Sequence, residues 1–208
     1  MKTAIQIILA LAIVGLSYLI YESIQKPIRF QEKQQTRATA VIERLKKIRD
    51  IQVAYKSLNS KYTGSFDTLI DFANNGKLPI IKMEGSLSDS LIAAGMTEAK
   101  AVKEGIIKRD TVYISVKDTL LKSLAPDSLR FVPFTNKAQF EMAAGNITTG
   151  SGVVVPVFEA KVTNKVYLNG LDRQEIINMN DLARSLDRYP GLMVGSIEEA
   201  NNNAGNWE

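Results

Sequence analysis

The longest hydrophobic run lies near the start of the chain, where the eighteen residues from Ala4 to Tyr21 contain no charge. As a helix of about 1.5 Å per residue, this run reaches roughly 27 Å, close to the ~30 Å hydrocarbon core of a bilayer. It is longer than the usual ~7–15 residues of a signal-peptide core, and no A-x-A-like cleavage site follows it. We therefore expect residues 1–21 to be an uncleaved membrane anchor.

A different pattern follows from Gln31 to about Ser60, where apolar residues recur every three or four positions. This spacing predicts a helix with one apolar stripe, made of Val41, Leu45, Ile48, Ile51, Tyr55, Leu58 and Tyr62. Pro27 precedes the stripe, so we expect a bend between the anchor and this stalk helix, residues 22–62. The stripe packs either on the chain's own domain or against another chain, as in a coiled coil.

Shorter patterns over residues 63–196 predict an α+β domain with short helices and a small, mainly antiparallel sheet. Ser65 and Thr97 are candidate helix N-caps. The clearest strand is Thr111–Val116, in which apolar and polar residues alternate. The predicted helices are Phe66–Phe72, Ser88–Ala94, Thr97–Glu104 and Asp172–Arg188, and the predicted strands include Leu78–Ile81, Phe140–Ala144, Val153–Val162 and Leu192–Val194. Residues 197–208 are polar and predict a loose C-terminal tail.

Positive charge is concentrated in the stalk. The whole chain has a formal charge of +4, and Glu22–Ser60 alone holds nine Lys or Arg against four acidic residues. Each basic residue beside a bilayer is attracted to anionic headgroups by about 1 kcal/mol, so Lys26, Arg29 and Lys33 are candidate lipid-headgroup contacts. Few aromatic residues are interleaved with these charges, and we expect no nucleic-acid partner.

The sequence around the anchor favours two opposite orientations. Four basic residues follow the hydrophobic run closely, whereas only Lys2 and the amino terminus precede it, which favours a cytoplasmic domain by the positive-inside rule. A short basic tail before the run is instead typical of a signal-anchor that carries the rest of the chain across the membrane. We expect the second arrangement: a single-pass protein of the inner (cytoplasmic) membrane with a periplasmic domain.

Catalytic chemistry is restricted because the sequence contains no cysteine and no histidine. Disulfides, thiol nucleophiles, Cys/His metal sites and Ser-His-Asp arrangements are thereby excluded. Gly145–Gly152 has the glycine spacing of a P-loop, but it lacks the lysine after the second glycine and lies between two predicted strands. It therefore predicts a hairpin loop. We expect no catalytic residue, no metal and no cofactor, and hence a protein that is not an enzyme.

The order of the first parts resembles that of type IV pilins and type II secretion pseudopilins. A hydrophobic N-terminal helix, a proline near its exit and an amphipathic continuation ending in IRDIQVAYKSLNSKYTGSFDTLIDF carry this resemblance, which covers roughly the first third of the chain. Pilin precursors have a processing-site glycine before the hydrophobic run and a glutamate at the fifth mature position. Here no glycine precedes Ala4 and no acid precedes Glu22, so the resemblance is one of architecture and transfers no functional residue.

These features favour a bacterial envelope protein with a structural or assembly role in a membrane complex, such as a secretion machinery. Its expected partners are the lipid bilayer, other envelope proteins and further copies of itself through the stalk. Trp207 either packs back onto the domain or anchors a partner, since tryptophan is enriched at interface hot spots. The candidate partner interface comprises Val41, Leu45, Ile48, Ile51, Tyr55 and Trp207. The alternative is a membrane-tethered ligand-sensing or substrate-binding module, which requires a pocket with convergent polar groups.

Overall fold

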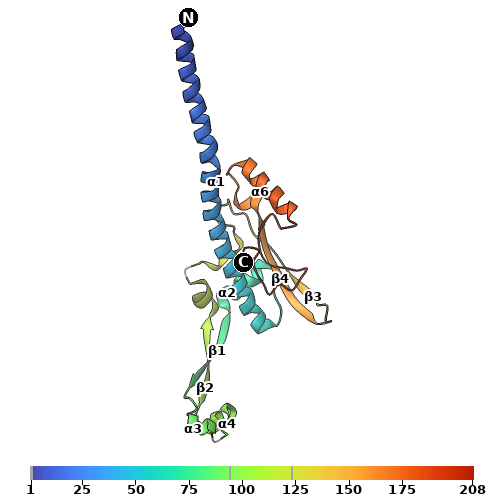
Figure 1. Cartoon of the computed structure of the whole chain (residues 1–208). Coiled ribbons are helices and arrows are strands. Elements are labelled where there is room, and N and C mark those ends of the chain that lie inside the picture. Colours follow the sequence, from blue (N-terminus) through green and yellow to red (C-terminus); the bar gives the residue numbers. More distant parts are fainter. Residues whose placement is uncertain (1, 94, 123) are drawn as a thin grey trace.

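The computed structural model describes residues 2–93, 95–122 and 124–208, and it is an α+β protein built on one long N-terminal helix (Figure 1). Helix α1 (Lys2–Asn59) includes both the hydrophobic run and the stalk. Pro27 lies inside it, and Figure 1 shows no sharp break along the helix, so the bend expected there is not seen. A proline removes one intrahelical N–H donor, but the hydrogen bonds of the turns before and after Pro27 keep the helix continuous.

The hydrophobic half of α1 stands free of the domain. Its large apolar side chains described from Ile5 to Ile28 are between 44% and 67% exposed. By length and composition, α1 is the one helix in the described part of the chain that is apolar enough to cross a membrane. An exposed apolar surface of this extent needs a covering medium or partner, because water solvates it poorly.

The other half of α1 packs across a three-stranded antiparallel sheet in the order β3-β4-β5. The strands are β3 (Glu141–Thr148), β4 (Val154–Thr163) and β5 (Gly191–Gly195). The predicted hairpin is confirmed, since β3 pairs with β4 from Glu141 opposite Lys161 to Thr148 opposite Val154. The core lies between α1 and this sheet, with Phe158, Ala160 and Val194 fully buried on the strand side.

Short helices complete the domain. Helix α2 (Phe66–Asn75) buries Leu69, Ile70 and Ala73, although Ser65 at its N-cap makes no side-chain capping bond. A π-helical turn η1 (Lys117–Leu121), a 3₁₀ turn η2 (Pro126–Arg130), helix α5 (Asn164–Tyr167) and helix α6 (Arg173–Ser185) follow along the chain. Asp172 caps α6 by accepting bonds from the Gln174 and Glu175 amides. The expected α+β class with a mainly antiparallel sheet is confirmed.

A two-stranded arm projects from the domain at the end opposite the N-terminus (Figure 1). Its strands β1 (Lys77–Glu84) and β2 (Lys108–Ser115) pair antiparallel along their full length. Between them, at the tip, lie helices α3 (Asp89–Ala93) and α4 (Glu98–Lys103), and Thr97 caps α4 as predicted. Ala94, the predicted last residue of the first tip helix, lies outside the described residues. We call residues 77–115 the arm.

The C-terminal residues fold back onto the sheet, so the expectation of a loose tail is wrong. The Gly195 amide donates to the Ala204 carbonyl, and the Asn206 amide donates to the Met193 carbonyl, both at 3.0 Å. The Asn206 side chain also bonds the main chain of Met193 and Gly191. These bonds run along the edge of β5 that no named strand covers, because backbone groups at a sheet edge need partners.

Candidate functional site

The four aliphatic residues of the predicted partner stripe lie in the domain's own core. Val41, Leu45, Ile48 and Ile51 have no exposed surface in the single chain, where α1 crosses the sheet. A side chain without accessible surface contacts no second chain unless the domain opens. Of the two interpretations of the stripe, the structure therefore shows the intramolecular one, and these four positions are corrected from interface to core.

The two aromatic interface candidates also pack within the domain. Tyr55 is half-buried and meets the ring of Phe72 edge-on, with 5.2 Å between ring centroids. Trp207 is partly buried against the core cluster, and its indole lies over the backbone of Gly205. Its Nε1–H is buried and finds no acceptor among the residues that the structure describes. The indole can pack this closely because residue 205 is glycine. A Cβ at that position would lie 2.4 Å from the ring and would push it away.

Exposed apolar residues gather instead on the arm, which the sequence did not single out as a site. Directly paired residues share a face of the ribbon, so Ile81 and Thr111 lie on one face with Tyr113, while Ile80 and Val112 lie on the other. Ile81 is 63% exposed, Tyr113 65% and Ile80 47%. A ribbon of two strands has marginal stability in water unless something covers a face. Both faces of this arm therefore carry exposed apolar side chains among charged ones.

The base of the arm is fixed to the domain, in contrast to its outer part. The Val116 amide donates to the Gly76 carbonyl at 3.0 Å and joins the two ends of the ribbon. Leu78 is partly buried against the core. A groove of about 810 Å³ lies between this base and α1, and it is lined in part by Val53, Leu78 and Ile114. The arm therefore projects from a base that is fixed to the domain.

The groove at the arm base is open and has mixed character. Its charged lining residues include Arg49, which pairs with Glu208 at 2.8 Å, and Lys56, which lies 4.8 Å from the ring centroid of Tyr62. These cations already have partners within the chain. Within the described ranges there is no group of three or more His, Cys, Asp or Glu side chains that could hold a metal ion.

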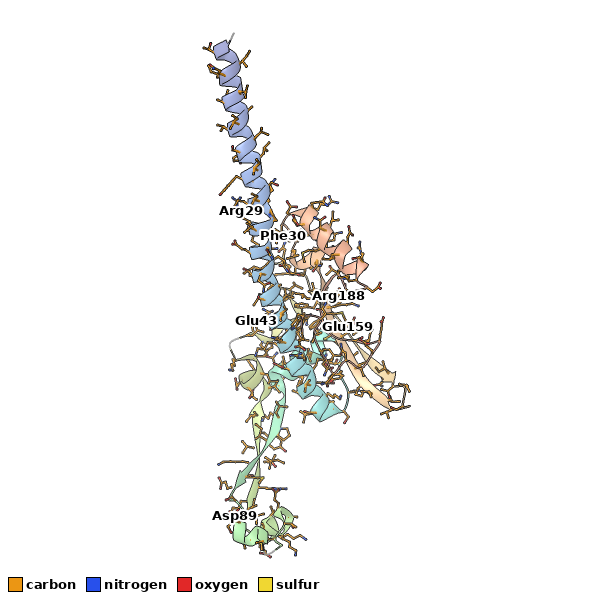
Figure 2. All side chains as sticks on the ribbon, viewed as in Figure 1. Arg29, Phe30, Glu43, Asp89, Glu159 and Arg188 are labelled. Atoms are coloured by element: carbon orange, nitrogen blue, oxygen red, sulfur yellow. The ribbon has the colours of Figure 1, made fainter. Side chains whose placement is uncertain are left out.

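The predicted headgroup contacts lie close together on α1 beside the turn between α5 and α6. Lys26, Arg29 and Lys33 line a small cavity of about 180 Å³ with Phe30 and residues 170–172. In Figure 2, Arg29 and Phe30 are labelled on α1 at the height of α6. The headgroup contact itself stays a prediction, and no sequence pattern indicated the turn that faces these three basic residues.

A buried acid on the sheet keeps its charge partner beside it. Glu159 on β4 is 6% exposed, and its Oε1 lies 2.6 Å from Lys161 Nζ, two residues along the same face of the strand. The hydrogen bond with Glu159 is the main cause that raises the pKa of Lys161. Because the ammonium group compensates the buried carboxylate, the sheet accommodates Glu159 without an unpaired charge.

Alkaline pH is expected to destabilise the domain through Tyr167. Burial raises the pKa of Tyr167 from 10.0 to about 12. The unfolded chain therefore loses this proton near pH 10 while the folded chain keeps it, so stability present below pH 10 falls as the pH rises toward 12. We expect the melting temperature of Tyr167→Phe to fall less between about pH 9 and pH 11 than that of the wild type.

Thermal unfolding of the full chain in detergent, at a series of pH values, measures this difference. Tyr113→Phe is the matched control, because Tyr113 is 65% exposed on the arm. Parallel pH profiles for Tyr167→Phe and the wild type would contradict the assignment.

Comparison with known proteins found no match. No protein-family model matches the chain, and no curated protein or solved structure is significantly similar to it. The class that the fold defines is an α+β domain on a long N-terminal helix whose first half is apolar enough to span a membrane.

Proposed function

We propose that this chain is a single-pass bacterial envelope protein with a non-enzymatic, structural or assembly role, and that it binds another envelope protein through its arm. The apolar half of α1 is the anchor in the inner membrane, and the domain lies in the periplasm. The pilin-like order of parts supports the assembly role by analogy of architecture. The observation that carries the proposal is the arm, with exposed apolar residues on both faces.

The arm favours a protein partner for a physical reason. Burying apolar surface contributes about 25 cal/mol per Å², and aromatic side chains such as Tyr113 bury much of the area at interfaces. In the free chain, that surface on Ile81 and Tyr113 remains in water. A partner that covers one face gains this burial and supplies the packing that a two-stranded ribbon lacks on its own.

Site-specific crosslinking tests the arm as the contact. The chain contains no cysteine, so Ile81→Cys introduces a single thiol on the arm. We expect a membrane-impermeant thiol crosslinker, added to spheroplasts, to join this variant to a discrete partner. The same reagent should fail with Asn74→Cys, an exposed position on α2. A product with the impermeant reagent also supports the periplasmic location.

A second substitution separates contact from folding. Tyr113→Asp, added to Ile81→Cys, should abolish the crosslinked product while the melting temperature of the domain changes little, because Tyr113 is 65% exposed. Equal products from Ile81→Cys and Asn74→Cys, or none from the arm in permeabilised cells, would contradict the assembly role. That result would favour the ligand-binding alternative.

A further inference from the structure

The corner of the domain nearest the hydrophobic run combines basic side chains of α1 with a turn far away in sequence. The turn between α5 and α6 lies against α1, and together they enclose the cavity of about 180 Å³. Lys26, Arg29 and Lys33 line one side, and Gly170, Leu171 and Asp172 line the other. We call these six residues the membrane-proximal corner.

This corner is held in place by contacts of α1 with the turn. Phe30, at the centre of the three basic residues, is only 9% exposed. Further along the helix, Arg37 Nη1 donates to the Tyr167 and Asn169 carbonyls at 3.1 and 2.8 Å. Both contacts fix the turn relative to the helix. The basic side chains therefore project from a rigid corner of the domain rather than from a free stalk.

Position along α1 places the three basic residues beside the bilayer that the hydrophobic run would cross. They follow Tyr21 by about 8, 12 and 18 Å along the helix axis. In a helix, Cα–Cβ bonds tilt toward the N-terminus, so these long side chains lean back toward the bilayer. Lys and Arg side chains extend their charged ends to the headgroup layer in this way.

Two of the three basic residues are free to bind a ligand, judged by the described part of the chain. Lys26 and Lys33 make no ion pair or hydrogen bond with any residue that the structure describes. Arg29 lies 3.8 Å from Glu22, and the Arg29 side chain is 53% exposed. The one acid that lines the cavity, Asp172, uses its Oδ1 to cap α6. The cavity therefore has three cations against one carboxylate and suits an anion.

We infer that the membrane-proximal corner binds the phosphate groups of anionic phospholipids, and that this contact holds the domain against the membrane surface. The inference rests on the proposed membrane anchoring. A lipid headgroup is favoured over free phosphate because the same helix carries the hydrophobic run and the basic residues, so headgroups surround the site. The turn between α5 and α6 then faces the bilayer, and the arm points away from it.

Fluorescence of the full chain in vesicles tests this contact. Gln174→Cys, at the start of α6, takes an environment-sensitive dye, and Ser86→Cys on the arm takes the same dye as a distant reference. Vesicles contain phosphatidylcholine alone or mixed with phosphatidylglycerol, and a headgroup quencher reports proximity. We expect stronger quenching at residue 174 in the mixed vesicles, lost at high salt, and no such change at residue 86.

A charge-matched pair of triple variants identifies the residues. Replacing Lys26, Arg29 and Lys33 by Gln should abolish the effect of phosphatidylglycerol at residue 174, since each lost cation weakens headgroup attraction about fivefold. Replacing Lys46, Lys100 and Lys103 by Gln removes the same charge elsewhere and should preserve it.

The outcomes separate this inference from the anchoring on which it rests. Equal quenching in both vesicle types, with the chain resistant to alkaline extraction, would overturn headgroup binding and leave the anchor intact. Extraction of the chain at alkaline pH would overturn the anchoring and this inference together. If both triple variants lost the phosphatidylglycerol-dependent quenching at residue 174 to the same extent, the assignment to the membrane-proximal corner would be overturned.

Discussion

Leu45→Ala is expected to destabilise the domain by about 3–5 kcal/mol. Leu45 has no exposed surface and lies where α1 crosses the three-stranded sheet. Shortening a fully buried leucine removes the transfer free energy of its methyl groups and leaves a cavity that the surrounding core fills only in part. Unfolding of the full chain in detergent, followed by the emission of Trp207, measures the loss, because Trp207 is the only tryptophan and packs against the same core.

Val53→Ala on the same helix is the matched control for this prediction. Val53 is 47% exposed, so we expect its substitution to change the free energy of unfolding by less than about 0.5 kcal/mol. If Leu45→Ala left the stability of the chain unchanged and abolished contacts with other chains, the stripe would be an intermolecular seam after all. The core position assigned to Leu45 would then be wrong.

The stripe on α1 shows what hydrophobic periodicity determines. Steps of three and four residues predicted both the helix and the face that Val41, Leu45 and Ile48 occupy, and both are found. The same spacing serves a core contact and a coiled-coil seam, because both need one apolar side of a helix. The choice between them depends on the sheet of β3, β4 and β5, which lies more than eighty residues further along the chain.

The arm shows the opposite case, a correct element in an unexpected environment. Thr111–Val116 was the clearest strand pattern, and β2 covers most of it. Alternation predicts that Val112 and Ile114 share a face, but it does not tell what covers that face. In the structure Val112 is 42% exposed. Among the described residues β2 pairs with β1 alone, in a sheet separate from that of β3, β4 and β5.

The C-terminal residues differ from prediction, and the turn at the membrane-proximal corner was not predicted, for a related reason. Polar composition at residues 197–208 predicted a loose tail. Instead, the side-chain amide of Asn206 forms hydrogen bonds with the main chain of β5 at the edge where a further strand would pair. Likewise, position alone predicted Lys26 and Lys33 as headgroup contacts. The turn opposite them, residues 170–172, lies at least 137 residues further along the chain. Such pairings follow from tertiary structure and leave no local pattern.

Gln52 is a further residue that the stripe pattern passed over. It lies on the core side of α1, has no exposed surface, and is bonded on both sides of its amide. Its Nε2 donates to the Thr63 carbonyl at 2.6 Å, and its Oε1 accepts from the Thr63 amide at 3.1 Å. Thr63 lies in the chain reversal between α1 and α2, where no helix or strand supplies partners. Gln52 therefore fixes the path of the chain out of α1.

Gln52→Met is expected to cost about 2–6 kcal/mol of the free energy of unfolding. Methionine has nearly the same length and flexibility, but it leaves the Thr63 N–H and C=O buried without partners, at about 1–3 kcal/mol for each group. Denaturant unfolding followed by Trp207 emission measures the loss, and hydrogen exchange should show faster exchange at the Thr63 amide. Gln35→Met, at an exposed position of α1, should change neither quantity. If Gln52→Met were as stable as the wild type, water or a shifted turn would have to satisfy Thr63, and Gln52 would not be the residue that fixes this reversal.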